Sequence, residues 1–357
     1  MSNMALIKKR ISATIVVAAA FFLGFETYTI ALVHFEGKTG LPENLGNSER
    51  IRSSLREHEP KENFSFAVVG DTGATSTFER LCDKLREEPL SFLVMNGDFV
   101  ESPTRGNHDY FRLNFPEKCK LNCPVFLIAG NRDVANGEMD RADNEVLPTD
   151  FERMYGPTNF FFEYGGCLFI GLCTLPPPYS TKESLAFLDS TLAKYRTDGG
   201  KVFVFTHMPL IKSAGTVTNA FENVQDFINV IDRYKVDYVI TAHFHGYNRV
   251  KIKDTVYLIN GGGGAPLDEK VTFGGLHHGI IFTVNHGAVS ERVVLVRHAA
   301  GIADIPRHFA ITQLFPVLVK HVSFTIAENT MIIGILLVCL WNIIHLRKNL
   351  VSKNQYM

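Results

Sequence analysis

The stretch that decides the fold of this chain is FSFAVVGDTG, residues 64–73. Phe64 to Val69 form a short run of aromatic, small and β-branched residues, which is typical of a buried strand. The polar group Gly70-Asp71-Thr72-Gly73 follows directly. We therefore expect a strand that delivers the Asp71 carboxylate to the rim of a sheet.

The same pattern recurs four more times along the chain. The apolar runs are 91–95, 125–129, 202–205 and 238–241, and the polar groups after them are Gly97-Asp98, Gly130-Asn131-Arg132-Asp133, Thr206-His207 and Ala242-His243-Phe244-His245. We expect these strands to bring carboxylates, an amide and imidazoles to one rim. Oxygen and nitrogen ligands without thiolates suit Mn²⁺, Fe or Zn²⁺, and the candidates are numerous enough for two ions. The pattern thus favours a dinuclear metal hydrolase.

Phosphoester hydrolysis suggests a role for each candidate ligand. Two metal ions that share one carboxylate can hold the substrate oxygens and lower the pKa of a bridging water, so that hydroxide attacks near neutral pH. Asp98 is the expected bridge. Asp71 is expected to bind one ion terminally, and Asn131 and His207 to complete the other.

The two remaining candidate ligands lie two residues apart. His243 and His245 are separated by Phe244 in what we expect to be an extended segment. Alternate residues of a strand project to the same side, so both imidazoles can face the rim while Phe244 points away.

This ordered set of motifs resembles the calcineurin-like metallophosphoesterase superfamily over roughly residues 63–296. The first motif ends in Gly73 rather than histidine, which is similar to the purple acid phosphatase branch. Three further features resemble that branch: His207-Met208-Pro209, Tyr247-Asn248-Arg249 and the Gly261–Gly264 run. The resemblance implies a metal-dependent phosphoric ester hydrolase.

Three positions depart from the family pattern, and one of them, Ala242 in place of the usual glycine, is expected to be neutral. Glu101 stands where purple acid phosphatases have a tyrosine, and it is either a tentative carboxylate ligand or a solvated loop residue. Arg132 replaces the motif histidine. Arginine stays protonated near pH 7 and cannot act as a general acid, but its planar fork suits phosphate. The Gly-Asn-Arg-Asp motif is similar to that of the UDP-2,3-diacylglucosamine hydrolases, which cleave a pyrophosphate, and this implies that Arg132 holds phosphate beside Asn131.

A second copy of the third motif occurs at Gly106-Asn107-His108-Asp109. No strand pattern precedes it, and the residues before it are typical of a loop. We therefore favour Asn131 as the ligand. His108 remains an alternative proton donor on the substrate side, from a mobile loop.

The rest of the domain alternates strands with helical patterns. Apolar residues recur at about one helical turn in 78–85, 185–192 and 224–234. With the β-rich sequence after His245, this predicts an α/β fold of the four-layer αββα type.

Both ends of the chain carry apolar stretches. Residues 11–33 follow Lys8-Lys9-Arg10 and form either a signal peptide or an uncleaved anchor; their length favours the anchor. Residues 330–346, extended back toward Phe324, are long enough to cross a membrane and precede Arg347-Lys348. The positive-inside rule then places both termini in the cytoplasm and the enzyme domain outward, in the periplasm, a lumen or the exterior.

These features divide the chain into six expected segments. They are an N-terminal anchor (1–35), a linker (36–62), the catalytic domain (63–300), a connecting or interfacial helix (301–325), a C-terminal transmembrane helix (326–347) and a tail (348–357). The 36 basic and 37 acidic residues nearly balance, so we expect no nucleic acid as a partner. The apolar stretches at the two ends make a lipid bilayer an expected partner.

The cysteines and the remaining histidines suggest no further chemistry. Cys119 and Cys123 could pair locally, whereas Cys82 is expected on a helix. His277 and His278 could line the entrance of the site, but a loop pair of this kind is more often exposed, so we expect them to face solvent. The Gly261–Gly264 run lacks the Lys-Ser or Lys-Thr of a nucleotide loop and is expected to let the backbone pass close to the rim.

The sequence thus predicts a membrane-anchored phosphoesterase with two divalent metal ions. Anchors at both ends make a lipid-linked phosphate an attractive substrate. The alternative is a non-catalytic binding or scaffold protein that keeps the fold.

Overall fold

The computed structural model describes residues 3–36, 41–57, 63–135, 144–197, 199–212, 215–267 and 275–354. The chain divides into two compact units. Unit 1 combines Met1–Lys38 with Ile305–Met357, and unit 2 comprises Thr39–Asp304. Unit 2 holds all five motif loops.

The first sheet of unit 2 is built around β1 (Asn63–Val69). Its strand order is β11-β10-β1-β2-β3, with β2 at Leu90–Met95, β3 at Val125–Leu127, β10 at His277–Asn285 and β11 at Ala288–Val296. β1 pairs parallel with β2 and antiparallel with β10, where Asn63 lies opposite Asn285. β1, β2 and β3 are parallel, so their carboxyl ends lie at one edge.

The second sheet has the order β4-β5-β6-β7-β9-β8. Its strands are β4 (Phe160–Tyr164), β5 (Cys167–Leu172), β6 (Val202–Thr206), β7 (Tyr238–Thr241), β8 (Tyr247–Ile252) and β9 (Thr255–Asn260). β5, β6, β7 and β9 are parallel, and the antiparallel strands β4 and β8 form the two edges.

An aromatic core lies between the two sheets. Phe66 of β1 is fully buried, stacks on Phe92 of β2 with ring centroids 4.9 Å apart, and meets Phe169 of β5 edge-on at 5.3 Å. Aromatic pairs in such offset and edge-on arrangements add to the free energy of apolar burial. This core holds the two sheets together.

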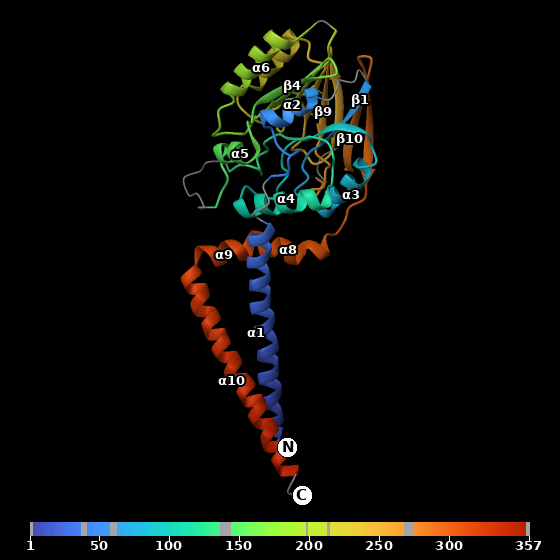
Figure 1. Ribbon diagram of the computed structural model, residues 1–357. Coiled ribbons are helices and arrows are strands. Elements are labelled where there is room, and N and C mark those ends of the chain that lie inside the picture. Colours follow the sequence, from blue (N-terminus) through green and yellow to red (C-terminus); the bar gives the residue numbers. More distant parts are fainter. Residues whose placement is uncertain are drawn as a thin grey trace. The chain divides into compact units, whose positions relative to one another are not determined.

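Helices cover the outer face of each sheet. The first sheet packs against α3 (Ser76–Leu85), α4 (Arg105–Lys118) and α5 (Pro148–Tyr155). The second packs against α6 (Lys182–Tyr195) and α7 (Val224–Arg233). Figure 1 follows these elements along the chain. The predicted four-layer αββα architecture is confirmed.

Part of the expected linker belongs to unit 2. Leu45 forms an isolated parallel bridge with Val125 of β3, and α2 (Glu49–Glu57) buries Ile51 and Leu55 against the core between the sheets. α2 is strongly amphipathic, and its apolar side supplies both buried residues. The described residues 41–57 are therefore packed structure rather than a free connection.

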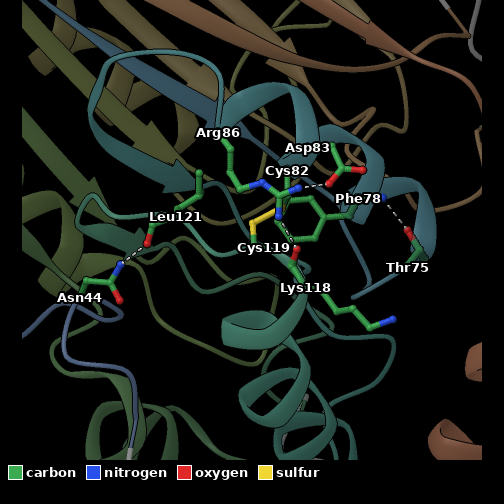
Figure 2. Close-up of a disulfide and its surroundings, with 9 residues drawn as sticks. All are labelled: Asn44, Thr75, Phe78, Cys82, Asp83, Arg86, Lys118, Cys119 and Leu121. Atoms are coloured by element: carbon green, nitrogen blue, oxygen red, sulfur yellow. Dashed lines mark hydrogen bonds and ion pairs between the residues drawn. A yellow bond between two sulfur atoms is a disulfide. The ribbon is translucent and has the colours of Figure 1, made fainter.

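A disulfide joins Cys82 of α3 to Cys119, the residue after α4, with their Cα atoms 5.0 Å apart (Figure 2). The pairing of Cys119 with Cys123 that the sequence left open does not form, because α3 and α4 pack side by side and bring Cys82 to Cys119. Cys123 is a free, buried cysteine. Arg86 adds a second link, donating from Nη1 to the Lys118 carbonyl at 3.3 Å.

Unit 1 contains two long helices, α1 (Asn3–Glu36) and α10 (Val322–Asn354), that contact one another. Both are apolar and long enough to cross a membrane, over Ile7–His34 and Val322–His345. Three short helical elements precede α10: α8 (Ile305–Phe309), the π-helix η3 (Ala310–Leu314) and α9 (Phe315–Lys320). α10 is continuous from Val322, so it crosses the expected boundary between residues 325 and 326.

Candidate metal centre

The five motif loops meet where strands of both sheets end. Asp71, Asp98 and Asn131 follow β1, β2 and β3 of the first sheet, whereas His207 follows β6 of the second sheet. His243 and His245 lie in the connection between β7 and β8. Both sheets therefore contribute side chains to one site.

One group of potential ligands surrounds the Asn131 amide oxygen. His207 Nε2 lies 3.1 Å and His243 Nδ1 2.9 Å from Asn131 Oδ1, and His207 Nε2 lies 3.3 Å from Asp98 Oδ1. One ligand atom from each of Asp98, His207 and His243 lies within 4.8 Å of the others. Donor atoms gathered this closely could bind one metal ion.

A second group centres on Asp71, which is completely buried. His245 Nε2 lies 3.4 Å from Asp71 Oδ1, and the His243 backbone N–H donates to Asp71 Oδ2 at 2.8 Å. Asp71 Oδ1 has no hydrogen-bond partner in the described part of the chain. A buried carboxylate oxygen left in this state fits a bound cation.

Backbone carbonyls orient two of the imidazoles. His207 Nδ1 lies 3.0 Å from the Asn96 carbonyl, and His245 Nδ1 lies 2.6 Å from the Pro266 carbonyl. An Nδ1–H that donates to a carbonyl leaves the Nε2 lone pair free. In both residues Nε2 is the atom that faces an aspartate, as a metal ligand requires.

The loops at this rim have unusual backbone geometry. Asp71, Asp98 and His243 have φ values of 53°, 51° and 69°. Such left-handed conformations cost non-glycine residues about 1–2 kcal/mol each, and they cluster at functional sites. The expectation that His243 and His245 alternate along an extended segment is therefore wrong, although both reach the site.

Two glycines allow the close packing of these loops. A Cβ at Gly97 would lie 2.3 Å from His207 Nδ1, and one at Gly261 would lie 2.7 Å from Asp71 Oδ2. The expectation that the Gly261–Gly264 run passes close to the rim is confirmed.

The charges of the site favour a cation. Burial alone would lower the pKa of His207, but the negative charges of Asp98 and Asp71 outweigh burial and raise it to about 10. Burial and the neighbouring His207 lower the pKa of His243 to about 4. The two buried carboxylates thus stabilise positive charge beside them, and a divalent ion would supply that charge. The donor set of oxygen and nitrogen atoms therefore fits Mn²⁺, Fe or Zn²⁺.

Asp133 fixes the backbone of the loops that carry the candidate ligands, a role that the sequence did not suggest. Its buried carboxylate accepts hydrogen bonds from the backbone N–H groups of Asp98, Phe99, Val100 and Gly130 at 2.7–3.2 Å. One side chain thus fixes two of the loops that carry ligands. Its place at the end of the third motif was the only signal in the sequence.

His108 is a buried structural residue that contacts Asp133, and it is not a proton donor in a mobile loop. It lies in α4, is fully buried, and has Nδ1 2.9 Å from the Tyr155 hydroxyl and Nε2 2.8 Å from the Asp133 carbonyl. Burial lowers its pKa to about 4, so it is neutral at physiological pH. The motif copy around His108 lies in the first turns of α4, where Thr104 is the N-cap and accepts from the Asn107 N–H at 3.4 Å.

Arg132 and Glu101 lie at the exposed edge of the site. The Arg132 backbone N–H donates to Asp98 Oδ1 at 2.8 Å, and its guanidinium Nη1 donates to the Glu101 carbonyl at 3.4 Å. Both side chains are exposed. The phosphate-binding role of Arg132 and the tentative ligand role of Glu101 remain predictions.

His277 and His278 are buried at the start of β10, contrary to the expectation that they face solvent. The His278 N–H donates to the Gly262 carbonyl at 2.8 Å. This hydrogen bond places the start of β10 against the glycine run, where both histidines are buried.

Comparison with known proteins identifies the fold. The family model for the calcineurin-like phosphoesterases matches residues 64–247. GAP50, the anchor in the inner membrane complex of Plasmodium, superimposes with a TM-score of 0.50 at 15% sequence identity, covering 71% of this chain and 95% of GAP50. No curated protein sequence matches the chain.

Two phosphatase structures are also similar at low identity. Purple acid phosphatase PPD1 from yellow lupin (Lupinus luteus) has a TM-score of 0.47 at 15% identity, and the match covers 65% of this chain and 51% of that chain. A dimetal phosphatase from Danio rerio has a TM-score of 0.43 at 12% identity, with 66% and 99% covered.

Proposed function

The chain belongs to the calcineurin-like phosphoesterase family, and we propose that it is a membrane-anchored, metal-dependent phosphoesterase that hydrolyses a phosphoester or a pyrophosphate. The observation that carries this proposal is the convergence of Asp98, His207 and His243, whose ligand atoms lie within 4.8 Å of one another. Asn131, Asp71 and His245 extend this group.

In this proposal two divalent metal ions are held by six side chains. Asp98 would serve both ions, and the other ligands would be Asp71, Asn131, His207, His243 and His245. When bound, such ions activate water and the phosphoryl group by Lewis-acid catalysis. The protein contributes rigid loops, oriented imidazoles and buried carboxylates that make the site selective for cations.

Arg132 is proposed to bind the substrate phosphate. Its backbone is hydrogen-bonded to Asp98, so its side chain begins beside the central ligand. A planar guanidinium binds two phosphate oxygens at once and remains charged at every physiological pH. Arg132 would therefore position the substrate without donating a proton to the leaving group.

We further propose that unit 2 faces an oxidising compartment and that both termini are cytoplasmic. The basic residues Lys8, Lys9, Arg347 and Lys348 support this orientation. The Cys82–Cys119 disulfide adds independent support, because disulfides persist outside reducing compartments. Alkylating free thiols in intact cells before lysis and mapping the peptides tests it: recovery of both cysteines in alkylated form would contradict the orientation.

The enzymatic proposal is tested on the purified full-length chain. Metal content is measured by mass spectrometry, and turnover of a chromogenic phosphomonoester and diester is measured with and without Mn²⁺. We expect metal-dependent turnover that Asp98→Asn reduces by at least 100-fold. The exposed Asp226→Asn on α7 is the matched control and should retain activity.

A non-catalytic binding or scaffold role is the second candidate. Two observations favour it: Arg132 replaces the motif histidine, and the fold is similar to that of GAP50, which is described as an anchor. Bound metal without turnover of any phosphoester would support this role. A folded chain with neither metal nor turnover would overturn the enzymatic proposal.

A further inference from the structure

Two buried asparagines, Asn96 and Asn260, connect the two sheets next to the strand ends that carry the candidate ligands. Asn96 follows β2 of the first sheet, and Asn260 is the last residue of β9 in the second sheet. Both side chains are fully buried. Each donates from its amide nitrogen to the backbone of the other sheet. These hydrogen bonds therefore fix the position of one sheet relative to the other.

Asn96 reaches the two strands of the second sheet that lead to histidine ligands. Its Nδ2 donates to the Thr206 carbonyl at 3.3 Å and to the Ile240 carbonyl at 3.1 Å. Thr206 directly precedes His207, and Ile240 lies three residues before His243. One side chain thus holds the ends of both β6 and β7.

The backbone of Asn96 is connected to the same group of ligands. Its carbonyl lies 3.0 Å from His207 Nδ1, and Asp98 follows it by two residues along the chain. Asp98, His207 and His243 are the residues whose ligand atoms lie within 4.8 Å of one another. Asn96 is therefore linked to every member of this group, although two of them belong to the other sheet.

Asn260 makes the equivalent connection to the strand that carries Asp71. Its Nδ2 donates to the Val68 carbonyl at 2.8 Å, and its own carbonyl accepts from the Gly70 N–H at 3.1 Å. Both partners lie at the end of β1, directly before Asp71. Asn260 thus holds this strand end against the second sheet.

The chain beside Asn260 also holds the loop that carries His245. The N–H of the next residue, Gly261, donates to the carbonyl of Gly246 at 3.0 Å, and Gly246 directly follows His245. His245 Nε2 and Asp71 Oδ1 lie 3.4 Å apart. Asn260 therefore serves this second group of ligands as Asn96 serves the first.

Each asparagine carries a cost in stability. The Oδ1 atoms of Asn96 and Asn260 have no hydrogen-bond partner among the residues that the structure describes. A buried acceptor in this state destabilises a fold. Apolar burial already holds the sheets together, but it has no directional preference, whereas a functional site needs its side chains placed to within about 0.5 Å. The amide donors supply this directional constraint.

We propose that Asn96 and Asn260 are positioning residues of the metal centre, one for each group of ligands. Asn96 places Asp98, His207 and His243, and Asn260 places Asp71 and His245. Each acts through the backbone or the ring of a ligand rather than on the ion. This inference rests on the proposed function, because it requires that both groups bind metal.

Metal titrations of the full-length protein in detergent test the assignment. Each asparagine is replaced with leucine, which has a similar volume and no hydrogen-bonding group. Zn²⁺ binding to chelator-treated protein is measured by calorimetry, and the visible absorption of bound Co²⁺ reports its coordination. Groups that orient metal ligands typically change metal affinity by about 10- to 100-fold. Asn96→Leu should cause such a loss at the ion that His207→Ala affects, and Asn260→Leu at the ion that His245→Ala affects.

Asn47→Leu is the matched control. Asn47 is also fully buried; its Nδ2 donates to the carbonyls of Leu127 and Pro157 at 2.7 and 3.0 Å, and its Oδ1 accepts from the Leu127 N–H at 2.9 Å. None of these hydrogen bonds reaches β1, β2, β6 or β7. Asn47→Leu should lower the urea midpoint at least as far as Asn96→Leu does, while both metal affinities and the Co²⁺ spectrum stay unchanged.

The outcomes separate this assignment from the enzymatic proposal. Unchanged metal affinities in Asn96→Leu and Asn260→Leu, or an equal loss in Asn47→Leu, would overturn the assignment even where the protein hydrolyses esters. Selective loss of one ion in each variant supports it even where no ester is hydrolysed. Circular dichroism checks that each variant is folded. If Asn96→Leu is not, Asn96→Ser, whose hydroxyl donates only one hydrogen bond, gives the same comparison.

Discussion

Reduction of the Cys82–Cys119 disulfide should destabilise the protein by an amount that the fold specifies. The bond links α3 to the end of α4, and both cysteines are almost fully buried. A crosslink stabilises the folded state chiefly because it restricts the unfolded chain, and the effect increases with the length of the closed loop.

The sequence separation of 37 residues gives the size of the effect. For a loop of this length the lost chain entropy corresponds to about 4 kcal/mol at 25 °C. A domain of this size changes its Tm by roughly 2–4 °C per kcal/mol, so reduction should lower the Tm by about 8–16 °C. A Cys119–Cys123 bond would close a much shorter loop and would contribute only about 2 kcal/mol.

The assay is thermal unfolding of the full-length protein in detergent, followed by fluorescence at one heating rate, with and without reductant. Counting free thiols confirms that the bond has been reduced. The double variant Cys82→Ala/Cys119→Ala should have a low Tm that reductant does not change. Cys123→Ala is the matched control and should keep the sensitivity to reductant. If Cys123→Ala removes this sensitivity, or if the reduced wild-type protein unfolds at an unchanged Tm, the reasoning is wrong.

Three further substitutions test the support of the site and the core. Gly97→Ala places a Cβ 2.3 Å from His207 Nδ1 at a φ of 86°, so metal binding measured by calorimetry should weaken at least tenfold while the circular dichroism spectrum is retained. Because His108→Phe leaves the Tyr155 hydroxyl without its imidazole partner, the free energy of unfolding in urea should fall by about 1–3 kcal/mol; an unchanged midpoint would argue against the support role. Phe169→Ala opens a cavity between the sheets and should cost about 3–5 kcal/mol in the same titration, whereas a loss below 1 kcal/mol would contradict the tight packing described for this core.

Local patterns in the sequence were enough to predict the five strands that lead into the motifs and the order of the ligands. Val202 to Phe205 are all apolar and Tyr238 to Thr241 are all aromatic or β-branched, as expected for strands that are buried on both faces, so each could be located without a structure. The polar residue after each strand then marked the rim of the sheet. The layered fold followed from the alternation of these strands with helical patterns.

The errors concern residues whose neighbours are distant in the sequence. His108 has the same motif letters as a ligand, but the approach of Tyr155 and Asp133 makes it a buried structural residue. Cys82 and Cys119 meet only because two helices pack together. Such contacts depend on tertiary structure, and no local pattern in the sequence encodes them.

The position of β1 in the first sheet sets an order of events during synthesis. One neighbour, β2, follows soon after β1, but on the other side Asn63 must wait for Asn285 of β10. At 5–20 residues per second, roughly 10–40 s separate the emergence of these two partners. During that interval one edge of β1 lacks its native partner, and an open edge of this kind can pair with another chain. Correct folding of the nascent protein therefore requires that the open edge of β1 does not pair with another chain before the β10–β11 hairpin has been synthesised.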